Sequence, residues 1–473
     1  MHRILNKSPL GRLLVLALHK TGYQAFVVGG AVRDLFLHRE PNDIDIATNM
    51  PATEMHRLEF TDGTFEEAGC ADASVTFIPI GVEFGVCAFA MNGEVIEVAN
   101  FRLDLAFDGR HRGVTVGVAK SIEEDLVRRD FSLNAMALDP FEEHDEKALV
   151  DPFGGIEAVA RGIINTPASP EMSFEQDPLR VLRAVRFMAK FGFAIDPGLI
   201  RAAHKRLVRK RFRLLSAERI RDELVKILEV EDGKAVATAF TVLQEMRILE
   251  LFLPELSALA GLPYRKEYHT EDPFGHTLLA LSHTGRDVVL RMAVVGHDMG
   301  KVATLEPPLV ATPGHARVSR DLVRGLMKRL KMYSVDLAAV AHLVDTHMDT
   351  LADGKPHRRL KRSGFFDFGV EHLERGKLIR KADLLGKAMD VSDKLAELEA
   401  VFEELKDLAL SLSFQSVKAL PVNGHDVMRI TGFKPGPRVG AVLRDLFERV
   451  VNGELPMDRE HLLRVIGVDH EMK

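Results

Sequence analysis

The chain has 473 residues, and this length predicts about three domains. Apolar residues make up 46% and charged residues 28%, a balance that excludes a chain disordered throughout. The formal net charge of −6 excludes a general polycation, so any nucleic-acid binding must come from local basic patches. Cys70 and Cys87 are too few for a disulfide framework or a cysteine-rich zinc module, and we expect both to be packing residues.

The N-terminal apolar run, residues 13–18, is too short for a secretory signal or a membrane span. It predicts an amphipathic first helix that packs on the domain behind it. Together with the low cysteine content, this favours a cytoplasmic protein without a membrane partner.

Short apolar runs predict a mixed α/β region over residues 1–150. The expected strands are residues 25–28, 44–47, 75–80, 84–89 and 95–101. Asn92-Gly93 between the last two strands predicts a hairpin turn. From residue 177 to about 415 the apolar spacing becomes mostly helical, and the end of the chain returns to Gly/Pro-punctuated sequence followed by helix.

A glycine pair follows the first expected strand and opens a helix. Gly29 and Gly30 allow a tight turn and close backbone approach to a phosphate. The free N–H groups of a helix start attract anions, and Arg33 would add a forked donor for triphosphate oxygens. The turn therefore predicts a nucleotide-binding site.

Two aspartates lie just downstream, and their spacing places them on one face of a strand. Asp43 and Asp45 are hard oxygen ligands of the kind that Mg²⁺ prefers, and Mg²⁺ usually keeps substrate phosphates in its shell. A two-metal site of this kind activates an attacking hydroxyl and neutralises leaving pyrophosphate. Glu97, on the strand 95–101, is the best candidate for a third carboxylate.

The segment 26–34 with Asp43-x-Asp45 resembles the class II nucleotidyltransferases, which comprise bacterial-type CCA-adding enzymes and poly(A) polymerases. The resemblance implies an α+β fold, with a polymerase β-like head followed by helical neck, body and HD domains. Residues 128–135 look like the family's ribose-contacting motif, which implies nucleotide contacts for Arg129, Asp130 and Asn134. Residues 108–111 match a flexible loop that helps to switch to A addition, although Arg112 replaces an expected proline.

A second nucleotide-binding feature begins at Asp177, which we expect to cap a helix whose first residue is Pro178. Arg180 would lie near Asp177 in the first turn, so that an acceptor and a donor could read a base edge. In the family this pair selects CTP and ATP, and Gln176 replaces the usual glutamate. Arg183 and Arg186 follow at helical spacing and are expected to support the site.

A basic run follows this helix over residues 201–213, with no acidic residue. Such clusters bind backbone phosphates in a salt-sensitive manner, whereas the plainer alternative is a solvated helix face. We expect the run to bind the tRNA acceptor stem through Lys205, Arg206, Arg209, Lys210 and Arg211.

The last constellation resembles the HD phosphohydrolase superfamily. His297-Asp298 in the order His-Asp-x-Gly-Lys, with upstream His276 and downstream Asp383, matches its metal ligands. His315 and His347 fit the extra ligands of two-metal members. Imidazole and carboxylate ligands suit Mn²⁺, Ni²⁺, Zn²⁺ or Fe, and a metal-bound water can hydrolyse phosphoesters.

These observations predict four regions: a nucleotidyltransferase head (1–150), a helical neck (151–250), an HD domain (251–415) and a tail (416–473). The predicted activity is template-independent, Mg²⁺-dependent addition of CCA from CTP and ATP to the 3′ end of tRNA. The alternatives are an A-adding enzyme, a poly(A) polymerase, or an HD phosphohydrolase whose N-terminal half only binds RNA. A non-enzymatic RNA-binding module would leave both metal constellations unexplained.

Overall fold

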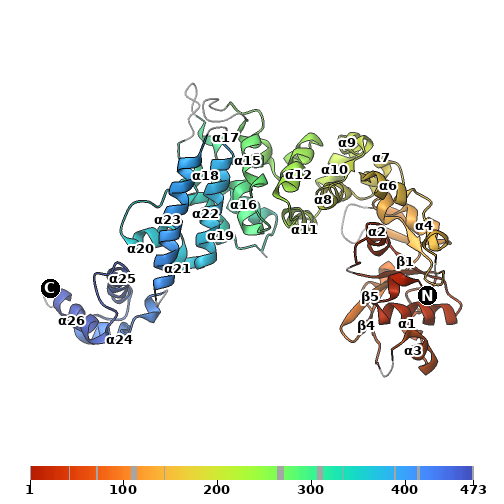
Figure 1. Ribbon diagram of the computed structural model, residues 1–473, viewed down its shortest axis with the longest axis horizontal. Coiled ribbons are helices and arrows are strands. Elements are labelled where there is room, and N and C mark those ends of the chain that lie inside the picture. Colours follow the sequence, from red (N-terminus) through yellow and green to blue (C-terminus); the bar gives the residue numbers. More distant parts are fainter. Residues whose placement is uncertain are drawn as a thin grey trace. The chain divides into compact units, whose positions relative to one another are not determined.

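The computed structural model describes residues 2–41, 43–70, 73–107, 114–142, 144–263, 271–305, 313–333, 335–387, 390–412 and 416–470 (Figure 1). The chain divides into two compact units, and the boundary between them crosses one helix, α12 (Gly233–Glu245). Unit 1 comprises Met1–Val230 and Thr238–Phe252, and unit 2 comprises Glu231–Ala237 and Leu253–Lys473. The expected loop at 108–111 lies outside the described residues.

Unit 1 begins with a mixed sheet whose order is β3-β4-β5-β2-β1-β8-β9. The strands are β1 (Ala25–Val28), β2 (Asp45–Thr48), β3 (Thr76–Ile78), β4 (Val86–Met91), β5 (Glu94–Asn100), β8 (Ala137–Leu138) and β9 (Leu149–Val150). Within the described part of the chain, β2 with β5 is the only parallel pairing in this sheet. The five expected strands are confirmed within about two residues, whereas the two-residue strands β8 and β9 were not expected.

The hairpin between β4 and β5 turns at Asn92 and Gly93, as predicted. Their φ angles are 52° and 85°, and two positive values in a row are what a type I′ turn requires. A second hairpin, β6 (Arg102–Phe107) with β7 (Val114–Val118), forms a separate antiparallel pair that the apolar pattern did not predict.

The first helix, α1 (Pro9–Lys20), is more deeply buried than an amphipathic helix would be. Residues 13–18 are all buried, and they share one apolar core with Val27, Ile46, Phe89 and Val98 of the sheet. Cys87 belongs to this core and Cys70 packs against it, which confirms the prediction for both.

The helices of unit 1 form two groups, an earlier one that alternates with the strands of the sheet and a later one that follows the sheet in the chain. Those of the head region are η1 (Arg3–Leu5), α1, α2 (Gly30–Phe36), η2 (Met55–Arg57), α3 (Asp62–Ala68), η3 (Val82–Phe84), α4 (Ile122–Val127), η4 (Ser132–Asn134), α5 (Asp145–Ala148) and α6 (Gly155–Arg161). The later ones are α7 (Pro170–Gln176), α8 (Arg180–Phe191), α9 (Pro197–Ala203), α10 (Arg206–Phe212), α11 (Ala217–Leu228), α12 and α13 (Leu249–Phe252), with a short parallel pair β10 (Ile163–Ile164) and β11 (Ala194–Ile195) between them.

The described residues of unit 2 form helices without strands, as the apolar spacing predicted. They are α14 (Pro254–Ser257), α15 (Pro273–Ser282), α16 (Val288–Gly296), α17 (Lys301–Thr304), α18 (His315–Arg329), α19 (Leu337–Thr346), α20 (Pro356–Arg362), α21 (Phe365–Phe368), α22 (Val370–Leu385), α23 (Ser392–Ser411), η5 (Val417–Ala419), α24 (Gly424–Thr431), α25 (Pro437–Val451) and α26 (Arg459–His470). The buried α16 packs against α15, α18, α19 and α22. Among the described helices, none is long and apolar enough to cross a membrane.

Candidate active site and metal cluster

The glycine turn lies where the sequence predicted it, between β1 and α2. Gly29 has a φ of 71°, and a Cβ atom there would lie 3.0 Å from Nη1 of Arg129. The positive φ therefore favours glycine at this position, and the end of the Arg129 side chain lies close to it. Residues 29 and 129, which are far apart in sequence, thus meet at the start of α2.

Arg33, which we predicted to contact triphosphate oxygens, is buried and has several partners within the protein. Its side chain donates to Asn134 Oδ1 at 2.7 Å, pairs with Asp34 at 2.7 Å and stacks 4.8 Å from the centroid of the Phe191 ring. These contacts place Arg33 and Asn134 together as a structural link between α2 and η4.

The candidate carboxylates gather at the pairing of β2 with β5. Asp45 is in parallel register with Glu97, whereas Asp43 precedes β2 instead of lying on it. Desolvation raises the pKa of Asp45, the charges of Glu97 and Asp43 raise it further, and Arg129 opposes them. Crowded oxygen ligands with a surplus of negative charge fit a hard divalent cation such as Mg²⁺.

The ribose-contact candidates are held by a half-buried ion pair and a hydrogen bond. Arg183 donates to Asp130 Oδ2, with 2.9 Å from its Nε, and Asn134 donates to Asp130 Oδ1 at 3.0 Å. Burial raises the pKa of Asp130, but Arg183 and these hydrogen bonds outweigh burial and lower it to about 2. Asp130 is therefore a fixed anion at neutral pH.

Two buried carboxylates that sequence reasoning missed orient the arginines of the site. Asp125, 1% exposed, pairs with Arg129 at 3.1 Å, and Glu223, 3% exposed, accepts from Arg186 Nε at 2.7 Å. Asp125 lies close to the motif that was noticed, but Glu223 comes from α11 and no local pattern connects it to α8.

Asp177 and Arg180 lie next to each other in the turn that precedes α8, with the Arg180 N–H 3.0 Å from the Asp177 carbonyl, but their side chains have different partners. Asp177 Oδ2 pairs with Arg219 of α11 at 2.8 Å, and Arg180 is buried, with its Nη1 2.9 Å from Ser173 Oγ. Helix α8 begins at Arg180 with Leu179 as N-cap, while Asp177 ends α7 and accepts from the Leu179 N–H. The cause is the turn at 177–179, which directs Arg180 into the interior.

The basic run divides into exposed and engaged side chains. Lys205, Arg206 and Lys210 are exposed. Arg209 pairs with Glu250 and Arg211 donates to the carbonyl of Glu175. Only part of the run is therefore open to a phosphate backbone.

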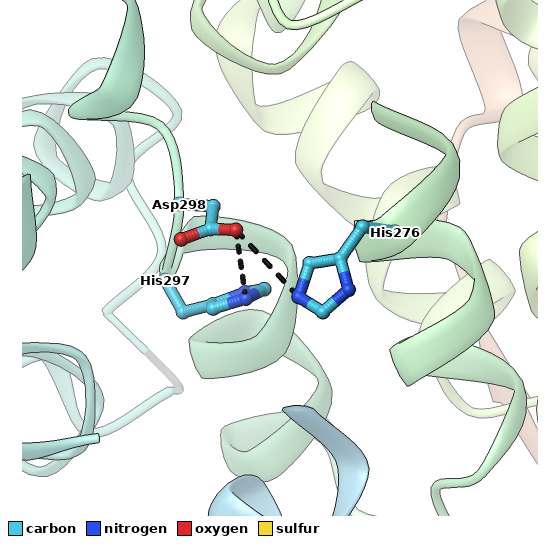
Figure 2. A group of neighbouring side chains, drawn as sticks. All are labelled: His276, His297 and Asp298. Atoms are coloured by element: carbon cyan, nitrogen blue, oxygen red, sulfur yellow. Dashed lines mark ion pairs between the residues drawn. The ribbon is translucent and has the colours of Figure 1, made fainter. Parts of the chain in front are cut away.

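In unit 2 the structure brings all six predicted metal-cluster residues together, from segments distant in sequence. Figure 2 shows three of them, His276, His297 and Asp298. One group comprises His276, His297 and Asp298, and a second comprises Asp298, His315 and His347. Asp298 belongs to both, with Oδ2 3.3 Å from His297 Nε2 and Oδ1 3.4 Å from His315 Nε2. A single carboxylate therefore lies between two candidate metal positions.

Backbone carbonyls fix the orientation of three cluster imidazoles. The Nδ1 atoms of His276, His297 and His347 lie 2.9, 2.7 and 2.7 Å from the carbonyls of Gly386, Val294 and Val344. Because a carbonyl can only accept, each Nδ1 must donate. The Nε2 atoms of His276 and His297 then face Asp298 and Asp383, and the Nε2 of His347 lies 3.3 Å from that of His315. This is the usual support for a metal-ligating histidine.

The electrostatics of the cluster also suit a bound cation. Burial lowers the pKa of His297, but Asp298 and Asp383 outweigh burial and raise it to about 9. Burial and the positive charge of His297 lower the pKa of His347 to about 3, so its ring is neutral. His297 Nε2 is buried without a hydrogen-bond partner among the described residues, as expected of a nitrogen shaped to hold a metal.

Known proteins that are similar to this chain are nucleotidyltransferases. Three family models match the chain: the Poly A polymerase head domain at residues 25–165, the RNA and SrmB-binding site of polymerase A at 192–259, and the tRNA nucleotidyltransferase domain 2 at 316–466. The crystal structure of the Bacillus stearothermophilus CCA-adding enzyme in complex with CTP has a similar fold, with a TM-score of 0.62 and 24% identity, covering 100% of this chain and 99% of that one.

Two curated relatives extend over nearly the whole chain. The CCA-adding enzyme of Geobacillus sp. (strain WCH70) is 29% identical, covering 96% of each chain. The CCA-adding enzyme of Geobacillus stearothermophilus is 30% identical over 452 residues, covering 95% of this chain and 94% of the relative. With this similarity and the site geometry above, the chain belongs to the family of CCA-adding enzymes, the class II tRNA nucleotidyltransferases.

Proposed function

We propose that this protein adds CCA to the 3′ end of tRNA from CTP and ATP, without a template and with release of pyrophosphate. The observation that carries the proposal is the parallel pairing of β2 with β5, which places Asp45 beside Glu97 close to Arg129 and the Gly29 turn, in a chain of this family.

In the proposed reaction the terminal hydroxyl oxygen of tRNA bonds to the α-phosphorus of CTP or ATP. The bond between that phosphorus and the bridging oxygen breaks, the electron pair leaves with pyrophosphate, and the proton of the hydroxyl passes to solvent. Asp43, Asp45 and Glu97 would hold Mg²⁺, which supplies charge neutralisation and an activated hydroxyl when bound. The rate would come mainly from positioning and electrostatics.

The chain's own residues would hold the nucleotide in place. The N–H group of Gly30, at the start of α2, would face the phosphates, and Arg129, paired with Asp125, would supply a cation beside them. Asp130 and Arg183 form a fixed pair for the ribose side. Asp177, oriented by Arg219, is the base-edge acceptor that we assign, with Arg180 supporting the wall behind it.

The test is extension of three tRNA transcripts that end before CCA, after C and after CC, each with Mg²⁺ and CTP, ATP or both. Completion of all three to CCA is expected. Extension of only the CC-ending transcript by one A would make this an A-adding enzyme, and long A tails would indicate a poly(A) polymerase. No incorporation by folded protein would contradict nucleotidyl transfer.

A second activity is favoured by the convergence of His276, His297, Asp298, His315, His347 and Asp383. We propose an HD-type phosphohydrolase site that would hold Mn²⁺, Ni²⁺, Zn²⁺ or Fe. Hydrolysis would bond a water oxygen to phosphorus and release the alcohol, which gains a proton. Release of phosphate from nucleotide phosphoesters by metal-loaded protein, abolished in Asp298→Asn, tests this activity, and a protein that binds no metal would refute it.

A further inference from the structure

A cavity of about 330 Å³ opens beside the metal cluster in unit 2. Its lining includes His347 and Asp383, both members of the cluster. The remaining walls come from α22, from the segment after α19 and from the long helix α23 (Figure 1). The volume is at the lower end of the roughly 300–1,000 Å³ typical of small-molecule sites.

The wall of the cavity is largely apolar where α22 and α23 meet. Leu384, Leu398 and Val401 line it, and Leu398 is 8% exposed. Apolar walls with a few convergent polar groups are characteristic of sites for small organic ligands. A flat ring could lie against this surface, whereas a bare phosphate ion would gain nothing from it.

The basic side chains that line the cavity have different environments. Lys387 pairs with Asp383 at 2.7 Å, next to the cluster. Arg380 is buried and donates to the backbone carbonyls of Gly376, Thr346 and Asp349. Lys394 is exposed, and within the described part of the chain it makes no ion pair.

Glu397 lies one helical turn after Lys394 and also lines the cavity. Residues at this spacing share a helix face, so α23 presents a donor and an acceptor side by side. Such a pair matches the polar edge of a base or the hydroxyls of a sugar. The cavity thus has an apolar wall, a polar rim on α23 and the metal cluster at its other side.

We propose that this cavity is the substrate pocket of the metal cluster, and that Lys394 and Glu397 are its specificity-determining residues for a phosphorylated nucleotide. The inference rests on the proposed phosphohydrolase function. The phosphoester faces His347, Asp383 and Lys387, and the nucleoside lies against Leu398 and Val401. The nucleotide is either free or the last one of an RNA strand.

The first experiment measures binding of adenosine 3′-monophosphate to Mn²⁺-loaded protein by calorimetry. Lys394→Ala/Glu397→Ala is expected to weaken binding about tenfold, and Val401→Trp, which fills the cavity, at least as much. Mn²⁺ binding itself stays unchanged in both. The matched control is Glu403→Ala/Lys406→Ala, an exposed pair with the same spacing on the same helix outside the cavity, and it leaves both affinities unchanged.

Hydrolysis provides a second readout. In Lys394→Ala/Glu397→Ala the KM for adenosine 3′-monophosphate rises about tenfold with kcat within about twofold, because the residues bind the nucleoside and not the reacting atoms. p-Nitrophenyl phosphate, which lacks sugar and base, keeps its KM. A short RNA with a 3′-phosphate, assayed beside the free nucleotide, shows which source of the terminal nucleotide the pocket prefers.

The outcomes distinguish a failure of the proposed pocket from a failure of the proposed phosphohydrolase activity. Wild-type protein that binds Mn²⁺ and the nucleotide but releases no phosphate would refute the phosphohydrolase, while weaker binding in the variants would still support the pocket. Nucleotide hydrolysis that is unchanged in both Val401→Trp and Lys394→Ala/Glu397→Ala would overturn the pocket and leave the activity standing. Because Lys394 and Glu397 are exposed, their substitution tests the proposal even if Val401→Trp does not fold.

Discussion

At the scale of single residues, Glu97 stands beside Asp45 because two strands pair in parallel register. We expect Glu97→Gln to lower kcat for CCA addition by about 10²-fold, since it removes the charge of a proposed Mg²⁺ ligand. Single-turnover incorporation of labelled CTP is the measurement. Glu66→Gln, an exposed carboxylate on α3, is the control, and equal rates for the two variants would exclude Glu97 from the site.

Arg219 is a residue that only the structure connects with the nucleotide site. Its pairing with Asp177 at 2.8 Å fixes the proposed base-edge acceptor. We expect Arg219→Ala to reduce the preference for CTP and ATP over UTP and GTP by about tenfold, because an unfixed acceptor discriminates less well. Misincorporation on a transcript lacking CCA measures this. Arg221→Ala, next to its partner Asp222 on the same helix, should keep the discrimination of the wild type.

The buried His372 should make the free energy of unfolding of unit 2 depend on pH. Burial, followed by the charges of His342 and Arg375, lowers its pKa to about 3. Above pH about 6.5 the ring is neutral in both folded and unfolded chains, whereas below it only the unfolded chain takes up the proton. When the pH falls from 7 to 5, the free energy of unfolding should therefore decrease by about 2 kcal/mol because of this residue.

Urea unfolding of wild type and His372→Gln at both pH values is the measurement. The variant should lose less stability on acidification, whatever its stability at pH 7. Exposed His425→Gln serves as the control and should follow the wild type. If the stability of wild type and of His372→Gln changed equally with pH, His372 would not be the source of the pH dependence.

At the scale of elements, α10 and its N-cap Lys205 carry exposed lysines beside the ion-paired Arg209. Lys205→Ala/Lys210→Ala should raise the KM for tRNA and reduce the salt dependence of binding by about two charges, with thermal stability unchanged. Arg209→Ala should instead cost about 1 kcal/mol of stability, because it removes the pairing with Glu250. tRNA affinity between 50 and 200 mM salt and thermal unfolding separate the two effects. A salt slope that stays unchanged in the lysine variant would place the tRNA elsewhere.

At the scale of the whole molecule, two compact units each carry one candidate site. Mn²⁺ should raise the unfolding temperature of unit 2, because a ligand at 100 times its Kd stabilises the state that binds it by about 2.7 kcal/mol. Calorimetry should show one of two transitions moving with Mn²⁺, and His297→Ala should abolish that movement. A shift that persists in His297→Ala would place the metal outside the cluster.

The sequence by itself determined the elements and most of the chemistry. Turn residues such as Gly29, Asn92 and Gly93 act through local backbone conformation, and the period of apolar residues marks strands and helices, so both can be recognised along the chain. The cluster residues could also be named in advance, because His297-Asp298 and the order of the other ligands along the chain resemble the HD phosphohydrolase superfamily.

Tertiary structure decided which partners those residues have. The Arg180 side chain is buried against Ser173, and Arg219, 42 residues from Asp177, forms the ion pair with Asp177. Glu223, Asp125 and the wall of α23 likewise depend on contacts between elements distant in sequence. The physical reason is that helical and strand periods are local, whereas the partner of a buried charge is set by which elements pack together to exclude water from it.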